Sequence, residues 1–308
     1  MIKNTNKINS YLLNNKELLL LLIFIFSRIY FINPFGVFFD SNEYLDILSN
    51  SNFITSLFIG HFPPHEGYIL IFWPIYQFAQ FLKINPSYIV IYEQILLSTI
   101  IIYCFYKITS YISSKSIALI ASILISITPL FWIANVSYMV EISYVFFYIS
   151  SLYLSILYLK KNKIYYLYIS SIFLTLSFIT YSAVLLWMPV YLSIIYFKNK
   201  EKLIKISIIL FIFSFIFSFL RVILISSIIH KTFQGTFYDL YISKTTQVNI
   251  VQYNLQEILI LIRNFIPLLR NYTPVVIIIS FISLIISFFK NKKYFTVWTS
   301  MGITCCIR

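Results

Sequence analysis

Hydrophobic residues form long, nearly continuous runs along this chain and do not alternate with polar residues. A helix needs about 17 to 25 apolar residues to cross a bilayer, whereas the strands of a membrane β-barrel alternate apolar and polar positions. The pattern therefore predicts an all-α integral membrane protein, a polytopic helical bundle of about 8–10 spans. The candidate spans are residues 18–32, 68–82, 88–106, 117–132, 138–159, 164–179, 183–197, 203–229 and 274–289, and another begins near Tyr294.

Composition and charge change this picture little. The 308 residues are 60% hydrophobic and only 11% charged, which leaves too little polar surface for a soluble globule. A net charge of +13 is also typical of nucleic-acid-binding proteins, but the lysines lie in short runs between spans, as in residues 160–163 and 198–200. Such runs are typical of cytoplasmic loops. We expect a multi-pass protein of the cell membrane that does not bind nucleic acid.

The segment after the first span is predicted to be an external loop. The chain begins with a basic stretch that has no small-residue cleavage site, so we expect a retained first span and a cytoplasmic N-terminus. Residues 33–66 then contain four acids and no lysine or arginine. Within this loop, residues 41–48 and 53–59 have the pattern of short helices lying along the membrane interface.

The charges leave one conflict in the topology. If residues 68–82 and 88–106 both cross the bilayer, Lys107 lies on the wrong side. Two alternatives stay open: residues 68–82 are re-entrant, or Lys107 and Lys115 are exceptions to the rule. Residues 230–272 are predicted to be a second external loop with an interfacial helix. The whole chain, residues 1–308, is predicted to be a single polytopic domain.

Two acids in the first loop, Asp40 and Glu43, are candidates for chemistry. In one alternative they only begin a helix, with Asp40 as the N-cap and Glu43 in the first turn. In the other, a partly desolvated carboxylate at the mouth of a membrane cavity acts as a general base. The same two acids are the candidates for a divalent metal, Mg²⁺ or Mn²⁺, although no cofactor is certain from the sequence.

The first loop ends in a rigid, proline-containing segment, residues 60–68. In one alternative this segment is only a turn into the next membrane helix. In the other, His61, His65 and Glu66 lie at the interface beside a lipid-linked phosphate. Their spacing alone does not establish a metal site.

Charged residues within the spans are further candidates. Glu141 lies inside the apolar boundary of a span, where an acid is costly unless it is paired or functional, and Glu93 raises the same question more weakly. Arg28, Arg221, Arg263 and Arg270 are candidates for holding the phosphate of a donor, because arginine binds phosphate in a bidentate manner. The alternative for each arginine is snorkelling to lipid headgroups.

The order of these motifs resembles a known family. Along the chain they are Arg28-Ile29-Tyr30, then Asp40-Ser41-Asn42-Glu43-Tyr44, then His61-Phe62-Pro63-Pro64-His65-Glu66-Gly67-Tyr68, and last Thr128-Pro129-Leu130-Phe131-Trp132 followed by Glu141. They resemble membrane glycosyltransferases of the GT-C type that use polyprenyl-phosphate sugars, including protein mannosyltransferase-like and aminoarabinose transferase-like members. The likeness covers about the first 200 residues.

This resemblance implies a function in building the cell envelope. It implies a GT-C-like fold and inverting transfer of a hexosyl or pentosyl unit from a polyprenyl-phosphate donor to a glycan, lipid or protein acceptor on the outer face. It also implies that Asp40 is the general base, that Glu43 assists it and that Glu141 is a second acid. Residues 61–66 would lie beside the donor phosphate. Family members usually run longer, so we expect a C-terminally truncated chain, either a fragment or a degenerate form.

Two other functions compete with this interpretation. A transporter or flippase of a lipid-linked solute would place Glu93, Glu141 and Arg221 along its path and would contain inverted repeats. No such repeat stands out in the sequence, and the acids concentrate at one external face. A structural membrane subunit would tolerate neutral residues at Asp40, Glu43 and Glu141.

Overall fold

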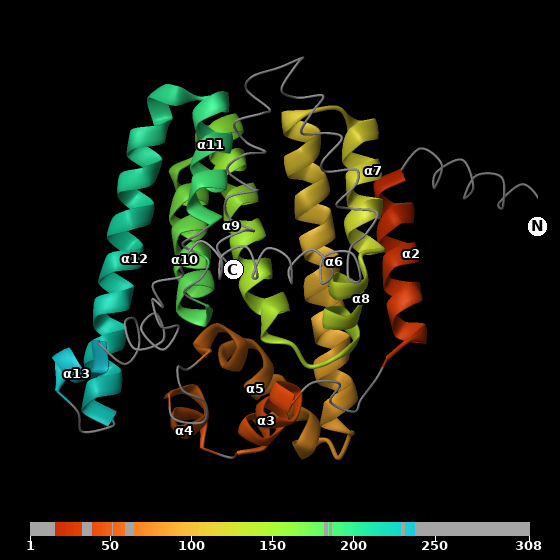
Figure 1. Ribbon diagram of the computed structural model, residues 1–308, viewed down its shortest axis with the longest axis vertical. Helices are drawn as coiled ribbons and strands as arrows, with labels where there is room; N and C mark the ends of the chain where they lie inside the picture. Colours follow the sequence, from red (N-terminus) through yellow and green to blue (C-terminus); the bar gives the residue numbers. More distant parts are fainter. Residues whose placement is uncertain are drawn as a thin grey trace, which may run out of the picture.

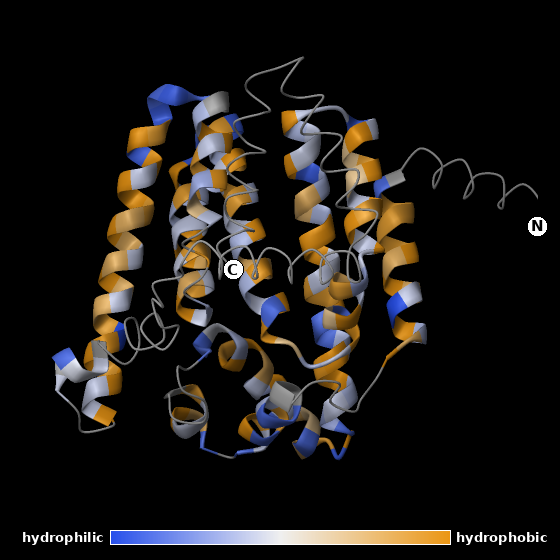
Figure 2. Ribbon diagram, in the orientation of Figure 1, coloured by the Kyte–Doolittle hydropathy of each residue, from blue (hydrophilic) through white to orange (hydrophobic). Residues whose placement is uncertain are grey.

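Every regular element in the described part of the chain is a helix. The computed structural model describes residues 16–32, 39–50, 52–58, 65–181, 184, 187–228 and 232–237. These residues form twelve helices and no strand (Figure 1). Hydrophobic residues cover the shafts of the upright helices, and hydrophilic residues gather toward the two ends (Figure 2). The prediction of an all-α membrane protein is therefore confirmed.

Three helices of the described residues are long and apolar enough to cross a bilayer on their own. They are α6 (Pro86–Ile112), α9 (Val140–Lys161) and α12 (Lys200–Ile228). A fourth span would combine α7 (Lys115–Ser126) and α8 (Pro129–Val136), which meet at a bend of 65°. Pro129 explains the bend. A helical conformation is disfavoured for the residue before a proline, here Thr128, and proline itself suits the first position of the next helix.

Shorter helices complete the upright part of the bundle. They are α2 (Lys16–Tyr30), α10 (Ile164–Thr180) and α11 (Met188–Lys198), and they run beside the long helices (Figure 1). The expected span at residues 274–289 lies outside the described residues. The span count of 8–10 therefore stays a prediction.

Buried hydroxyl groups join three neighbouring helices. The Tyr191 hydroxyl of α11 lies 2.6 Å from Ser155 Oγ, 2.9 Å from Ser170 Oγ and 3.1 Å from Ser151 Oγ. The two serines of α9 and Ser170 of α10 are small, so the backbones of these helices can approach closely. Each hydroxyl has a partner inside the protein, as a polar group in a membrane interior requires.

The loop that follows α2 is predicted from the sequence to be external, and it is structured. It contains α3 (Phe39–Ser49) and α4 (Phe53–Phe58), close to the two short helices expected there, and it leads into α5 (Glu66–Phe81). Ser56 Oγ donates to the carbonyl of Ile47 at 2.9 Å, and Gln77 Nε2 of α5 donates to the carbonyl of Leu48 at 2.7 Å. All three helices lie at one end of the bundle (Figure 1).

Helix α5 begins and ends at this same end. Its start is held by His65, whose Nδ1 lies 2.6 Å from the carbonyl oxygen of Thr180, the last residue of α10. After its last turn, residues 82–85 lead directly into the first turn of α6. With only 16 residues, α5 lies across the end of the bundle and does not cross to the other side (Figure 1).

This placement removes the conflict in the charge pattern. Because α5 does not cross, α6 carries Lys107 to the end where α2 begins, and Lys107 forms an ion pair there with Glu17. The turn after α9 and the start of α12 lie at this end too, joined by a hydrogen bond of 2.7 Å from Lys202 Nζ to Asn162 Oδ1. The re-entrant alternative for residues 68–82 therefore fits the structure, and Lys107 needs no exception to the positive-inside rule.

Cysteine labelling in intact cells tests this topology. In a background whose three cysteines are replaced by serine, we expect Ser49→Cys and Ile84→Cys to react with a membrane-impermeant maleimide. Lys163→Cys should react only after the membrane is opened, because it lies at the opposite end. Reaction of Ile84→Cys only in opened cells, like Lys163→Cys, would mean that α5 does cross the bilayer.

Candidate active site

Three consecutive residues dock the first loop onto the upright helices. His65 donates its Nδ1 hydrogen to the Thr180 carbonyl at 2.6 Å. Glu66 forms an ion pair with Arg221 of α12, in which Arg221 Nε donates to Oε1 and Nη2 donates to Oε2 at 3.0 Å. At Gly67, an added Cβ would lie 1.9 Å from Thr180 Oγ1, so only glycine fits this approach to α10.

The ion pair is almost completely buried. Glu66 is 3% exposed and Arg221 is 8% exposed. An unpaired charge in this setting would be expensive, whereas the two-point contact between guanidinium and carboxylate satisfies both groups. The structure therefore gives the charge of Glu66 a partner inside the protein. The expected contact of His65 and Glu66 with a donor phosphate stays a prediction, and His61 lies outside the described residues.

Helix α3 carries the two acids of the first loop. It begins at Phe39, two residues before the expected start, so Asp40 lies in the first turn and is not the N-cap. Glu43 is partly exposed. The next residue, Tyr44, is buried, and its ring lies 5.0 Å from the ring of Tyr68 and 5.8 Å from that of His65. Tyr44 therefore fixes α3 against the start of α5.

Glu141 lies in the first turn of α9 and is partly exposed. The loop before it is held by Gln94, a fully buried side chain of α6. Gln94 Nε2 donates to the carbonyl of Ala134 at 2.9 Å and to the carbonyl of Met139, also at 2.9 Å. This one amide therefore fixes the segment that positions Glu141. Gln94 is not singled out in the sequence analysis, although an amide side chain inside an apolar span is a signal for a buried hydrogen bond.

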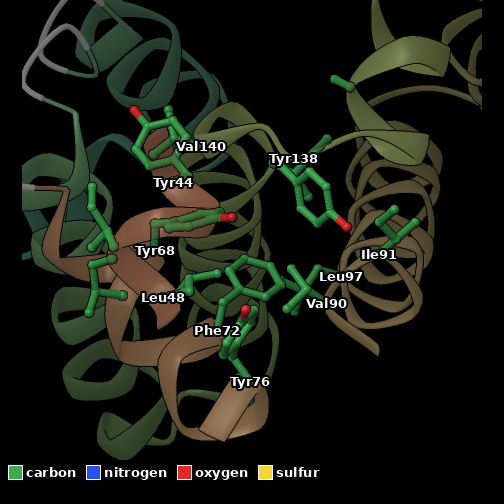
Figure 3. Close-up of a cluster of buried hydrophobic side chains, with 14 of the residues drawn as sticks. Tyr44, Leu48, Tyr68, Phe72, Tyr76, Val90, Ile91, Leu97, Tyr138 and Val140 are labelled. Atoms are coloured by element: carbon green, nitrogen blue, oxygen red, sulfur yellow. The ribbon is translucent and has the colours of Figure 1, made fainter. Parts of the chain in front are cut away.

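One apolar cluster joins the elements that carry the acids. Tyr44 of α3, Tyr68 and Phe72 of α5, Tyr138 of the α8–α9 loop and Val140 of α9 all belong to it (Figure 3). Tyr68 is fully buried and lies between the side chains of α3 and the α8–α9 loop (Figure 3). The acids of α3 and α9 are thus attached to a single packed unit at one end of the bundle.

Arg28 connects two other motifs of the sequence. Its guanidinium lies between two rings, 4.1 Å from the centroid of Phe24 and 3.8 Å from that of Trp132. It also donates to the carbonyl of Ser126 and, at 2.9 Å, to Ser27 Oγ. At 2% exposure, the side chain joins α2 to the bend between α7 and α8. A role of Arg28 in binding phosphate stays a prediction.

The remaining predicted site residues are less constrained by the structure. Arg263 and Arg270 lie outside the described residues. Within the described ranges, no three histidine, cysteine, aspartate or glutamate side chains come together as a metal site. The expectation of Mg²⁺ or Mn²⁺ at Asp40 and Glu43 stays a prediction.

Comparison with known proteins identifies the family. Residues 69–235, more than half of the chain, match the model of a family described as dolichyl-phosphate-mannose-protein mannosyltransferase. The chain belongs to this family. It is therefore a GT-C-type membrane glycosyltransferase that depends on polyprenyl-phosphate sugars, which confirms the resemblance drawn from the order of the motifs. No curated protein and no solved structure matches the chain.

The match to the mannosyltransferase family covers only part of the site. It runs from within α5 to within α13 (Phe233–Phe237) and therefore includes Gln94, Glu141 and Arg221. Helix α3, with Asp40 and Glu43, precedes the matched residues. The roles expected for these two acids therefore stay predictions, which rest on the order of the motifs.

A double-mutant cycle tests the buried ion pair. We expect Glu66→Gln to lower the free energy of unfolding by about 3 to 5 kcal/mol, because Arg221 is then left buried without its counter-charge. Adding Arg221→Met should recover part of this loss. Denaturation in detergent or in bilayers would measure both changes. Additive losses in the double variant would show that the two side chains are not coupled.

Replacing the buried amide of α6 tests how the Glu141 segment is held. Gln94→Leu removes two hydrogen bonds and leaves the carbonyls of Ala134 and Met139 without this donor. We expect stability to fall by about 1 to 3 kcal/mol and sugar transfer to fall further than stability explains. Gln80→Leu, at an exposed glutamine of α5, is the control. Unchanged stability and transfer in Gln94→Leu would contradict the positioning role.

Proposed function

We propose that this protein transfers a sugar from a polyprenyl-phosphate donor to an acceptor hydroxyl on the outer face of the membrane. The reaction would take place at the end of the bundle formed by α3, α5 and the start of α9. One observation carries the proposal: the acid-bearing elements of this family member are packed into one unit at the end opposite its lysine-rich turns.

The chemistry needs two kinds of group. A carboxylate must remove the proton of the acceptor hydroxyl as its oxygen attacks the sugar carbon, and cationic groups must stabilise the departing lipid phosphate. We assign Asp40 as the base, Glu43 as its assistant and Glu141 as a second acid. A single displacement of this kind inverts the configuration at the sugar carbon.

The departing phosphate would lie near the end of the first loop. The segment proposed to lie beside this phosphate contains His61, His65 and Glu66. The cations proposed to stabilise it are Arg28, Arg263 and Arg270. Arg221 is engaged by Glu66, so its charge is already matched within the protein. The transferred unit would be a hexose or a pentose, and the acceptor a glycan, a lipid or a protein.

The orientation of the protein follows from the positive-inside rule. The turns that carry Lys160 to Lys163 and Lys200 to Lys205 would face the cytoplasm, together with the N-terminus. The acids of α3 and α9 would then face the outside of the cell membrane. A transporter that used Glu93, Glu141 and Arg221 along one path is less well supported, because Arg221 is held by Glu66.

A transfer assay with matched variants tests the proposal. The protein in lipid bilayers is given a panel of radiolabelled polyprenyl-phosphate sugars, and product formation is compared with that of Asp40→Asn and Glu141→Gln. We expect Asp40→Asn to lower the rate at least about 100-fold, because it removes the base.

Asp46→Asn is the matched control, since Asp46 is an exposed acid of the same helix. It should retain the parental rate. Full activity of Asp40→Asn would remove the assigned base but keep the enzyme. Absence of transfer from every donor by the parent protein would contradict the proposed function.

A further inference from the structure

Two lysine-rich turns lie side by side at the end of the bundle opposite the acids. One joins α9 to α10 and the other joins α11 to α12 (Figure 1). Lys202 Nζ of the second turn donates to Asn162 Oδ1 of the first at 2.7 Å. Asn162 ends α9 in the left-handed conformation, with φ of 54°, which makes the first turn tight. We call the joint area the basic surface: Lys160, Lys161, Lys163, Lys200, Lys202 and Lys205.

The basic surface has a strong excess of positive charge. Glu201 is the one acid among residues 160–163 and 199–205, against six lysines. Two helices, α10 and α12, also begin here, and the N-terminus of a helix adds partial positive charge. The ammonium groups of Lys160 and Lys161 lie over tyrosine rings, 4.4 Å from the centroid of Tyr111 and 5.3 Å from that of Tyr166.

Apolar surface begins immediately next to these charges. Four large side chains within two helical turns of the lysines are strongly exposed: Tyr165 at 47%, Tyr168 at 44%, Tyr196 at 42% and Ile204 at 68%. Tyrosines are typical of the level of lipid headgroups, and isoleucine is typical of the acyl-chain region. A cluster of cations directly beside exposed apolar side chains fits a ligand with an anionic head and an apolar tail.

We propose that the basic surface is a binding site for anionic phospholipids. Lys160, Lys161, Lys163 and Lys200 would contact the phosphate of the headgroup, and the acyl chains would lie along the exposed faces of α10 and α12. Nucleic acid fits this surface poorly, because the apolar side chains below the lysines would remain in water. The site is separate from the proposed transferase centre, and it does not depend on that function.

Lipid binding by the full-length protein tests this proposal. The protein, delipidated in a neutral detergent, is titrated with phosphatidylglycerol or phosphatidylcholine, and bound lipid is counted by native mass spectrometry. We expect phosphatidylglycerol to bind at least about tenfold more tightly, since each lysine near an anionic headgroup adds to the affinity. High salt should weaken this preference.

Variants separate a specific site from general attraction. Changing Lys160, Lys161, Lys163 and Lys200 together to glutamine should abolish the preference, and changing them to arginine should keep it. Lys83→Gln, at an exposed lysine in the turn between α5 and α6 at the opposite end of the bundle, should have no effect. The arginine variant keeps the test valid if the glutamine variant fails to fold.

Three results would overturn the proposal. One is equal affinity for the two lipids, and another is a preference for phosphatidylglycerol that survives in a folded glutamine variant. The third is displacement of the lipid by inorganic phosphate at equal concentration, which would mean that the lysines bind free phosphate and not a lipid.

Discussion

A buried pair of opposite charges, Glu66 and Arg221, determines how the first loop meets the membrane helices. Neither charge would be stable alone when buried, so the start of α5 and the C-terminal part of α12 must stay together. The neighbours of Glu66 add to this constraint, since His65 bonds the end of α10 and Gly67 leaves no room for a side chain. Helices α3 and α4 then pack on α5, so the acids of α3 depend on the same contact.

The resulting molecule has two ends of different chemistry. Because α5 stays at the end where it starts, one end collects the structured loop with its acids and the other collects the lysine-rich turns (Figures 1 and 2). Between them, polar groups such as the hydroxyls around Tyr191 are satisfied within the bundle. In the proposed reaction the donor comes from the bilayer, so its phosphate and sugar would meet the acids at a single interface.

The sequence predicts much of this fold, because the length of each apolar run and the positions of the lysines are local properties of the chain. It predicts the short helices of the first loop and, through the order of its motifs, the family. It could not predict the partner of Glu66, since Arg221 is 155 residues away and many cations were possible. Nor could it choose between a crossing and a re-entrant α5, or distinguish the buried amide of Gln94 from an ordinary polar residue in a span. These features depend on contacts between distant segments.

Photo-crosslinking of the donor tests the central claim, that sugar transfer takes place at the end of the bundle that holds the docked loop. A polyprenyl-phosphate sugar carrying a diazirine on the sugar would be illuminated with the protein in bilayers, and the labelled peptides mapped by mass spectrometry. We expect label in residues 39–49, 65–68 and 138–141. Label confined to the lysine-rich turns, residues 160–163 and 199–205, would contradict this account.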